Sequence, residues 1–289
     1  MMKDAIISFL KGLWIGGTMT VPGVSGGAMA MIMGVYDRLI YSVSHLFKEF
    51  KKSVIFLIEF AIGGVIGFVL LAKAITWLLE SPTFSVPFHF FFVGAIAGGI
   101  PIIFKSAKVK KFSPACIICP VIGIVLVVLI WMIPQDLFHV SFADNKLKYF
   151  AFQIFAGILA AIALVIPGIS LTQIFAMLGI YGDIMAVVGN MDIKGILRYV
   201  PLGIVSVLGT YLLAKALEPA MKYHPTVTYL LIFGFLLGSI PQLLSDIHYG
   251  IGSSAGTWLL CAVAAVAGFF ALYYMSRVEI KRIEAAQAE

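Results

Sequence analysis

Two copies of a short Pro-Gly-x-Ser motif are the residues best suited to chemistry. The first copy is Pro22-Gly23-Val24-Ser25-Gly26-Gly27, and the second is Pro167-Gly168-Ile169-Ser170, followed by Thr172 and Gln173. Proline is tolerated at the start of a helix, and glycines let the backbone approach a ligand closely. A helix beginning after each motif would direct its free N–H groups and positive dipole end at the break. With the hydroxyls as further donors, each break could hold a phosphate or a carboxylate.

Both motifs interrupt long apolar stretches of an unusually hydrophobic chain. The 289 residues are 61% hydrophobic and 12% charged, with a mean hydropathy of +1.05, whereas a soluble domain carries about 25% charged residues. A membrane span needs roughly 20 apolar residues, and such runs occur at about 54–79, 88–104, 114–133, 195–217, 226–247 and 255–276. Two further apolar regions, 5–47 and 149–190, each contain one motif. Inside a membrane, a broken helix is tolerated only where protein or a wet cavity surrounds it, so we expect the two breaks to form the binding site.

The chain is an internal duplication. Pro22 to Ser25 and Gly34-Val35-Tyr36 recur 145 positions later as Pro167 to Ser170 and Gly179-Ile180-Tyr181. Two later blocks recur in the same order, and each half therefore holds one interrupted hairpin and three spanning helices. Because each half makes an odd number of crossings, the second must lie upside down relative to the first. We predict an all-α polytopic integral membrane protein. Two inverted-topology repeats, about 1–134 and 146–278, would each contain a Pro-Gly-broken re-entrant hairpin plus three transmembrane helices, and 279–289 would form a cytoplasmic tail.

The distribution of basic residues predicts the topology. A cytoplasmic N-terminus places most of them on one side of the membrane, as the positive-inside rule requires: Lys3, Lys48, Lys51, Lys52, Lys105, Lys108, Lys110, Lys111, Lys222, Arg277, Lys281 and Arg282. We therefore expect a multi-pass protein of the cytoplasmic membrane with both termini in the cytoplasm. The basic residues form short clusters between apolar segments, which indicates topology signals and contacts with membrane lipid headgroups rather than nucleic-acid binding.

Few charged residues lie near the motifs or inside the spans. Glu59 stands within an apolar run, where a carboxylate often carries a coupling proton or cation. Arg38, Arg198 and the matched pair Lys73 and Lys215 could offset the charge of an anionic substrate. The alternative for each of these four cations is snorkelling to a lipid headgroup.

Two other classes of function remain open at this point. Helix N-termini at Gly-Ser-Pro breaks also bind small anions, so a transporter or channel for a soluble anion is the first alternative. Residues 23–27 match G-x-S-x-G, the motif of serine hydrolases, but the second copy lacks the later glycine and the five histidines fall near predicted membrane edges or loops. An intramembrane serine hydrolase is thus the weaker alternative. Cys116-x-x-Cys119 lacks further ligands, and we expect no metal and no cofactor.

The paired motifs, each followed by Gly-x-Tyr, resemble a bacterial and archaeal membrane family. It was formerly called a domain of unknown function and is now associated with undecaprenyl-phosphate translocation. The resemblance covers nearly the whole chain. It implies a flippase, not an enzyme, that returns the lipid carrier from the outer to the inner leaflet for peptidoglycan and other envelope polymers.

The resemblance also implies how the substrate is held. Residues 22–27 and 167–170 would cradle the phosphate, while the polyprenyl tail stays in lipid through a lateral opening between the halves, which work by alternating access. The family favours Ser-Gly-Ser where this chain has Ser170-Leu171-Thr172. At this difference from the family pattern, two alternatives stay open: both breaks bind phosphate, or one dominates and the other is its structural counterpart.

Overall fold

The protein folds entirely into helices within the part of the chain that the structure describes. The computed structural model describes residues 2–21, 23–109, 111–134, 146–190, 192–245 and 255–288. Six of the helices are long and apolar enough to cross a membrane. The predicted all-α, multi-pass membrane architecture is therefore confirmed.

The two halves of the chain contain the same series of elements. The first half consists of α1 (Met2–Thr18), α2 (Gly26–Ile32), α3 (Tyr36–Ser44), α4 (Phe50–Glu80), α5 (Ser85–Ala107) and α6 (Ala115–Trp131). The second half consists of α7 (Lys146–Val165), α8 (Leu171–Met177), α9 (Tyr181–Gly189), α10 (Ile193–Arg198), α11 (Val200–Tyr223), α12 (Pro225–Ser245) and α13 (Ala255–Ala288). Among the helices of the described residues, α10 alone has no counterpart. The inverted orientation and the bounds of the repeats remain predictions.

Two of the predicted spans differ from the structure. The span expected at 114–133 is the 17-residue helix α6, which is about 26 Å long at 1.5 Å per residue. The span expected at 195–217 is divided at Tyr199 into α10 and α11. Pro201 lies in the first turn of α11. Because proline has no N–H to donate to a carbonyl of the preceding turn and fits the first turn of a new helix, it favours this division.

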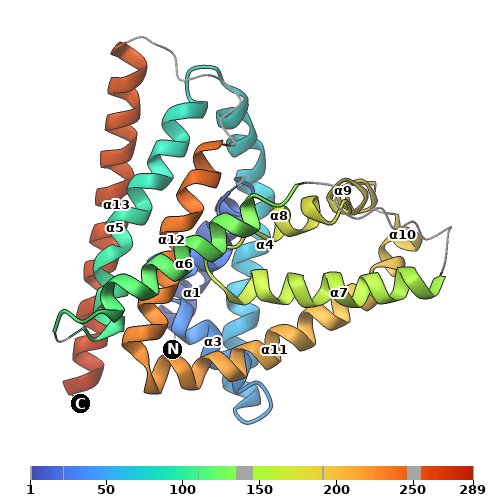
Figure 1. The fold of residues 1–289 in the computed structure, drawn as a ribbon, viewed down its shortest axis with the longest axis horizontal. Coiled ribbons are helices and arrows are strands. Elements are labelled where there is room, and N and C mark those ends of the chain that lie inside the picture. Colours follow the sequence, from blue (N-terminus) through green and yellow to red (C-terminus); the bar gives the residue numbers. More distant parts are fainter. Residues whose placement is uncertain are drawn as a thin grey trace.

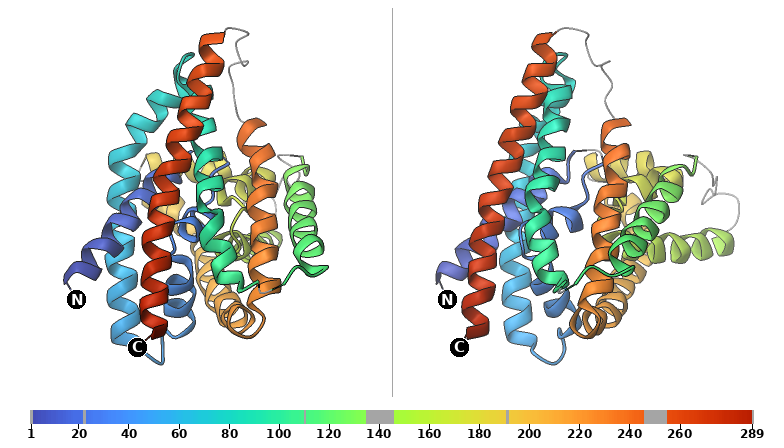
Figure 2. Two further views of the ribbon diagram at one scale, coloured as in Figure 1. Left: turned by 90° about the vertical axis from the view of Figure 1, so that its left-hand side faces the viewer. Right: turned by 60° about the vertical axis from the view of Figure 1, so that its left-hand side comes forward.

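The long helices pack in pairs, two within a half and two between the halves. The pairs between the halves are called here the exchanged pairs. Within the halves, α1 lies along α4 and α7 lies along α11. Between the halves, α13 packs on α5 and α6 packs on α12. Figure 1 shows the α5–α13 pair rising along one side and the α7–α11 pair extending away from it, and both chain ends lie at the same end of the molecule (Figure 2). The last helix of each half thus packs on the other half.

Small residues bring the exchanged helices into backbone contact. A methyl group on Gly94 would lie 1.9 Å from the Ala265 carbonyl oxygen, and one on Gly234 would lie 2.2 Å from the Pro120 carbonyl oxygen. Gly94 and Gly234 are matched positions of the duplication. Such close approach through small residues is typical of membrane helices, which gain van der Waals contact from it. Close backbone contact at a glycine therefore joins the helices in both exchanged pairs.

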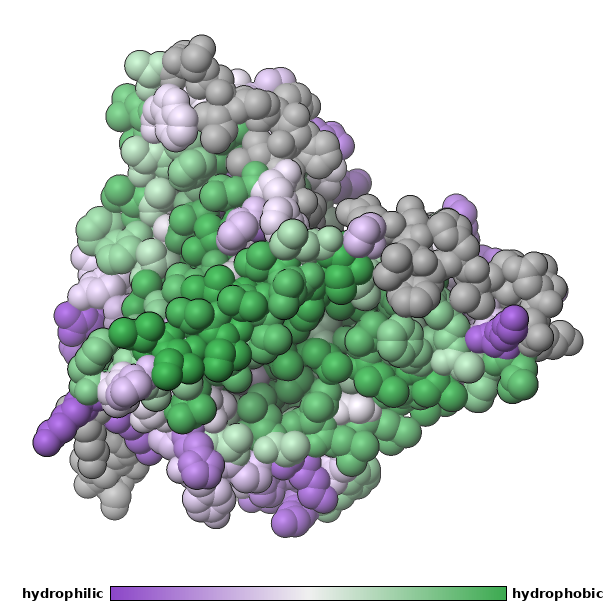
Figure 3. Space-filling model, in the orientation of Figure 1, coloured by the Kyte–Doolittle hydropathy of each residue, from purple (hydrophilic) through white to green (hydrophobic). Residues whose placement is uncertain are grey.

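The surface fits a protein surrounded by lipid. Figure 3 shows a broad hydrophobic area across the middle of the molecule, with hydrophilic residues gathered along its lower edge. Large apolar side chains such as Val65, Val69 and Val207 are at least 65% exposed. A soluble monomer rarely exposes a continuous apolar area of this kind.

Candidate functional site

Each motif breaks its helix at a glycine with a left-handed backbone. Gly23 has φ of 76° and Gly168 has φ of 90°, values that side chains rarely adopt. A methyl group on Gly168 would also lie 2.4 Å from the Phe235 carbonyl oxygen. Pro22 lies outside the described residues. The predicted breaks are confirmed, since α1 ends at Thr18 and α7 at Val165, before the short helices α2 and α8 begin.

A second glycine turn follows each short helix. Gly34 and Gly179 have φ of 65° and 71°. After them, the Val35 N–H donates to the Ala30 carbonyl at 2.9 Å and the Ile180 N–H donates to the Phe175 carbonyl at 3.0 Å. This six-to-one bond ends a helix in a Schellman motif. The backbone therefore repeats the same break and turn in both halves.

The two breaks meet in the interior, although 145 positions separate them in the chain. The Tyr36 hydroxyl donates to the Val165 carbonyl at 2.6 Å, immediately before the second motif. A methyl group on Gly27 would lie 3.3 Å from Cα of Pro167. The first motif and its Gly-x-Tyr turn are thus packed directly on the second break.

Between the motifs lies a cavity of about 430 Å³, called here the motif cavity. Its walls are mostly apolar and come from α1, α2, α3, α4, α7, α8, α9 and α11. Residues of both motifs line it: Val24, Ser25, Gly26, Gly27, Ile169, Ser170 and Thr172. The structure therefore brings together the two segments that the sequence predicts to form the site.

Hydroxyl groups are the main polar side-chain groups of the motif cavity. The Ser25 hydroxyl caps α2 by accepting the Ala28 N–H at 3.4 Å, and only 4% of Ser25 is exposed. The Ser170 and Thr172 hydroxyls are hydrogen-bonded to each other at 2.7 Å. Helices α2 and α8 are only seven residues long, so the hydroxyls and first-turn N–H groups are what this wall offers to a ligand.

Gln173 has a different environment from the other motif residues. Its side-chain oxygen accepts a hydrogen bond at 3.4 Å from the amide nitrogen of Gln242, which is 3% exposed. Gln173 therefore links α8 to α12, while its neighbour Thr172 lines the motif cavity.

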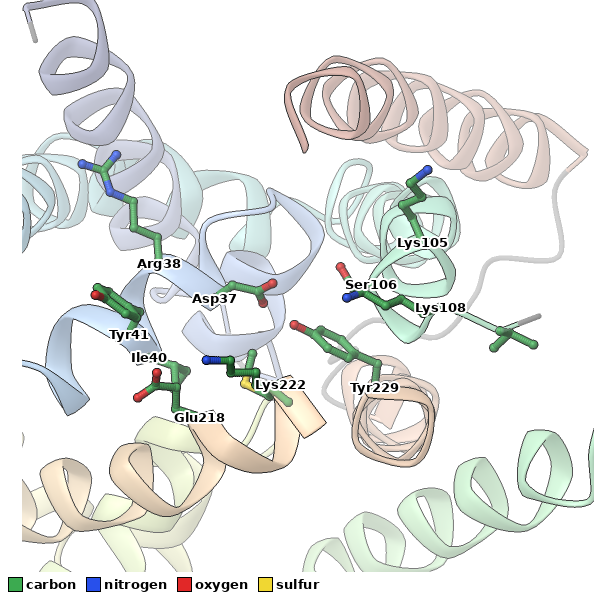
Figure 4. Close-up of a pocket in the computed structure, with 12 residues that line it drawn as sticks. Asp37, Arg38, Ile40, Tyr41, Lys105, Ser106, Lys108, Glu218, Lys222 and Tyr229 are labelled. Carbon is green, nitrogen blue, oxygen red and sulfur yellow. The ribbon is translucent and has the colours of Figure 1, made fainter. Parts of the chain in front are cut away.

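A second, polar cavity of about 960 Å³ lies on the other side of α3, and we call it the basic vestibule (Figure 4). It is enclosed by α3, the C-terminal ends of α5 and α11, and α12. Its charged lining residues are Asp37, Arg38, Lys105, Lys108, Glu218 and Lys222. All of these except Glu218 are solvent-exposed, so the vestibule is open to water.

Helix α3 contributes residues to both cavities, and so does α11. Tyr36 and Leu39 line the motif cavity, Asp37 and Arg38 line the basic vestibule, and Ile40 lines both. Successive helical residues are rotated by about 100°, so Tyr36 and Arg38 point about 200° apart. The polar and apolar faces of α3 thus form the walls of two different compartments.

The predicted counter-charges do not lie at the breaks. Arg38 faces the basic vestibule, with its guanidinium 4.0 Å from the Phe56 ring centroid and donating to the Ser8 hydroxyl at 3.3 Å. Arg198 lines a third cavity, beyond the far end of α11, a helix of 24 residues and therefore about 36 Å long.

The remaining charged candidates lie on α4 and α11. Lys73 is exposed, and so is Lys215, whose ammonium lies 5.7 Å from the Tyr211 ring centroid. Glu59 is half-buried on α4. None of the described residues that line the motif cavity carries a charge. The roles predicted for these residues remain predictions.

Comparison with known proteins matches residues 15–249 to the VCA0040-like family, described as undecaprenyl phosphate translocase-like. The chain belongs to the undecaprenyl phosphate translocase-like family. A protein of Staphylococcus aureus named polyprenyl-phosphate transporter is 28% identical over 282 residues, which are 94% of this chain and 96% of that protein. A protein of the same name from Vibrio cholerae is 27% identical over 256 residues, covering 82% of this chain and 76% of its own length. No solved structure matches significantly.

Membership of this family confirms the resemblance that the paired motifs suggested, but the motifs did not reveal the basic vestibule. Asp37 and Tyr229 are new candidates, with the Tyr229 hydroxyl beside the Asp37 carboxylate and the Ser106 side chain (Figure 4). One sequence feature could have pointed to the vestibule: Asp37 is an acidic residue directly after the Gly-x-Tyr turn and next to Arg38. The vestibule lysines were present in the sequence as topology signals only.

The surroundings of Ser25 bear on the serine hydrolase alternative for this translocase-like protein. Such an enzyme needs a base that takes the proton of the nucleophilic hydroxyl. None of the described residues lining the motif cavity is a histidine, and the Ser25 hydroxyl caps α2. The G-x-S-x-G match therefore reflects a helix break with an N-cap.

Proposed function

We propose that the protein is a transporter, rather than an enzyme, that moves undecaprenyl phosphate across the cytoplasmic membrane. It would return this lipid carrier from the outer to the inner leaflet for peptidoglycan and other cell-envelope synthesis. The names of the two relatives support a polyprenyl phosphate as substrate. The observation that carries the proposal is the meeting of both Pro-Gly-x-Ser breaks at one cavity.

The motif cavity suits a ligand with a phosphate head and an isoprenoid chain. Ser25, Ser170 and Thr172 supply hydroxyls for the phosphate, whereas the other walls are largely apolar. Side chains from both halves, among them Phe68 and Met185, line the cavity and are also exposed on the surface. This rim supports a lateral route through which the tail remains in lipid while the head is bound.

Alternating access of the two halves is the transport mechanism that we propose. The phosphate would bind at the breaks, and the hairpins would open the motif cavity to one leaflet at a time. Glu59 is proposed to couple this step to a proton or cation. Glu59→Gln should then reduce transport and its pH dependence in proteoliposomes, and unchanged transport with an unchanged pH profile would remove Glu59 from the mechanism.

Ligand-induced stabilisation of the purified protein in detergent tests the proposed substrate. Undecaprenyl phosphate should raise the thermal unfolding midpoint, because a ligand that binds only the folded state stabilises it. Undecaprenol and inorganic phosphate each lack one part of this ligand and should not raise the midpoint. Ser25→Ala should reduce the shift. Ser239→Ala is the matched control, since Ser239 is a buried serine bonded to the Leu236 carbonyl and does not line the motif cavity.

The ligand-induced shift, rather than the midpoint itself, is the quantity to compare. Loss of the Ser25 cap alone costs about 1 kcal/mol and lowers the midpoint of that variant without any ligand. A response to inorganic phosphate alone would favour a transporter or channel for a small soluble anion. No response to undecaprenyl phosphate would refute the proposed substrate.

A further inference from the structure

The basic vestibule contains more charge than its own ion pairs use. Its described lining includes four basic and two acidic side chains. Lys105 is paired with Glu284 at 2.6 Å, and Glu218 lies 3.2 Å from His45 and accepts the Ser44 hydroxyl at 2.5 Å. Arg38 is stacked on Phe56. Of the other charged groups, Lys222 lies 5.6 Å from the Tyr223 ring centroid, and Asp37 is hydrogen-bonded to Tyr229. Lys108 is the third.

Lys108 and Lys222 approach the same space from different helices. Both line the basic vestibule. Figure 4 shows the Lys108 side chain directed toward the Tyr229 hydroxyl, whereas Lys222 extends toward Glu218. Lys108 ends α5 in the first half, and Lys222 lies in the last turn of α11 in the second half. Within the described part of the chain, neither ammonium group forms an ion pair at 4.0 Å or less. Two cations from opposite halves thus face one water-filled space.

The backbone at Lys108 is an independent indication of function. Lys108 has φ of 50° and ψ of 37°, and among the described residues it is the one with a side chain at positive φ. This position after a helix normally favours glycine, which adopts the conformation without steric cost. Backbone strain of this kind concentrates at functional sites. Lys108 caps the end of α5 in this conformation, and its side chain lines the vestibule.

The motif cavity and the basic vestibule complement each other chemically. The motif cavity has apolar walls and no charged side chain among its described lining, whereas the vestibule is charged and wet. A phosphate carries more than one negative charge at neutral pH, and burial without a cation is costly. Ile40 lines both cavities, which are therefore neighbours across α3.

We infer that the basic vestibule is a second binding site, for a phosphate monoester, in which Lys108 and Lys222 bind the phosphate oxygens. The inference rests on the proposed function, because the phosphate is assigned to the head of the transported lipid. The vestibule is at the end of the molecule that carries Lys105, Lys108 and Lys222, the face predicted to be cytoplasmic. In this site the phosphate headgroup would bind before the lipid leaves the protein.

Asp37 lowers the affinity of the vestibule site for phosphate. Its carboxylate faces the same space as the lysines and supplies them with a counter-charge when no phosphate is bound (Figure 4). An arriving phosphate must compete with this carboxylate and is also repelled by it. The headgroup is therefore held long enough to leave the motif cavity but is released readily, which a transporter requires.

Binding of a soluble short-chain prenyl phosphate to the full-length protein in nanodiscs tests the inference. Lys108→Gly and Lys222→Gln should each weaken binding roughly tenfold, as expected for loss of a charge-assisted hydrogen bond, and Asp37→Asn should strengthen it. Lys111→Gly is the matched control, because Lys111 is an exposed lysine of the same segment that does not line the vestibule. The prenol without phosphate should not respond to any of these changes.

Four outcomes separate this inference from the proposed function. Weaker binding in both lysine variants with tighter binding in Asp37→Asn supports the vestibule site. Wild-type binding and transport with unchanged affinity in the lysine variants overturns the vestibule site and leaves the transport proposal standing. Absence of prenyl phosphate binding to the wild type overturns both. Lysine-dependent binding of inorganic phosphate alone overturns the assignment to a lipid head.

Discussion

Replacement of Gly168 by alanine tests how the second break is built. An alanine there would have to adopt φ near 90°, and its methyl group would lie 2.4 Å from the Phe235 carbonyl oxygen. A left-handed conformation costs a side chain about 1–2 kcal/mol, and an extra methyl group in a packed site costs about 1–3 kcal/mol. Gly168→Ala should therefore destabilise the protein by about 2–5 kcal/mol.

Gly182→Ala is the matched control for this change. Gly182 is in α9 of the same half, and a methyl group there would meet nothing within 4 Å. Within a helix, alanine is favoured over glycine by about 0.5–1 kcal/mol, so this variant should be as stable as the wild type or slightly more so. Equilibrium unfolding in detergent measures both. Equal stability of the two variants would refute the account of the break as a glycine-dependent turn against α12.

Three further changes have defined outcomes. Tyr36→Phe leaves the buried Val165 carbonyl without its 2.6 Å donor and should reduce the free energy of unfolding by about 1–3 kcal/mol. Lys108→Gly removes backbone strain and should raise the free energy of unfolding by about 1 kcal/mol, even though phosphate binding falls. The hydrogen bond from Tyr41 lowers the pKa of Glu49 below its ordinary 4.5. The stabilisation by Glu49 is then complete at neutral pH and is lost as pH falls from 4.5 through the lowered pKa, so Glu49→Gln should be less sensitive to acid in unfolding midpoints measured between pH 7 and 3.

Each of these changes has an outcome that contradicts it. Tyr181→Phe, at the matched position where 37% of the side chain is exposed, should have little effect on stability, so equal losses in the two Tyr→Phe variants would remove the role of the Tyr36 bond. A less stable Lys108→Gly protein would show that the lysine supports the fold instead of straining it. Acid sensitivity retained in Glu49→Gln would assign that sensitivity to other carboxylates.

The breaks were predictable because they depend on local backbone chemistry. Gly23, Gly34, Gly168 and Gly179 all have positive φ, and the requirement for glycine appears directly in the sequence as a repeat at a fixed spacing. Proline and glycine determine the backbone conformation of their immediate neighbours, so their effect does not depend on distant parts of the chain. The two breaks and the helical class could therefore be predicted from the residues alone.

The environment of each repeated residue could not be predicted in the same way. Tyr36 is 2% exposed and Tyr181 is 37% exposed, although both follow the same glycine turn. The difference arises from long-range packing, since α3 lies against α11, whereas the prominent contacts of α9 are with α8 and α10. Equivalent sequences meet different neighbours, and no local pattern encodes which ones.

Arg38 shows a related limit on the candidate site. The sequence places it two positions after Tyr36, which suggested that its charge would serve the motif. On a helix this spacing turns the two side chains about 200° apart, so Tyr36 faces the motif cavity and Arg38 faces the basic vestibule. The grouping of Lys108 and Lys222 with Asp37 likewise depends on how α5 and α11 end beside α3.

Movement of undecaprenyl phosphate between leaflets of proteoliposomes is the most direct test of the central claim. The purified chain, the double variant Ser25→Ala with Ser170→Ala, and the control Ser239→Ala would be reconstituted with labelled lipid, and headgroup exposure would be followed with a phosphatase added outside. We predict that the wild type and the control render lipid from both leaflets accessible and that the double variant is much slower. Equal rates in protein-free vesicles and in wild-type vesicles would contradict the claim that this protein transports the lipid.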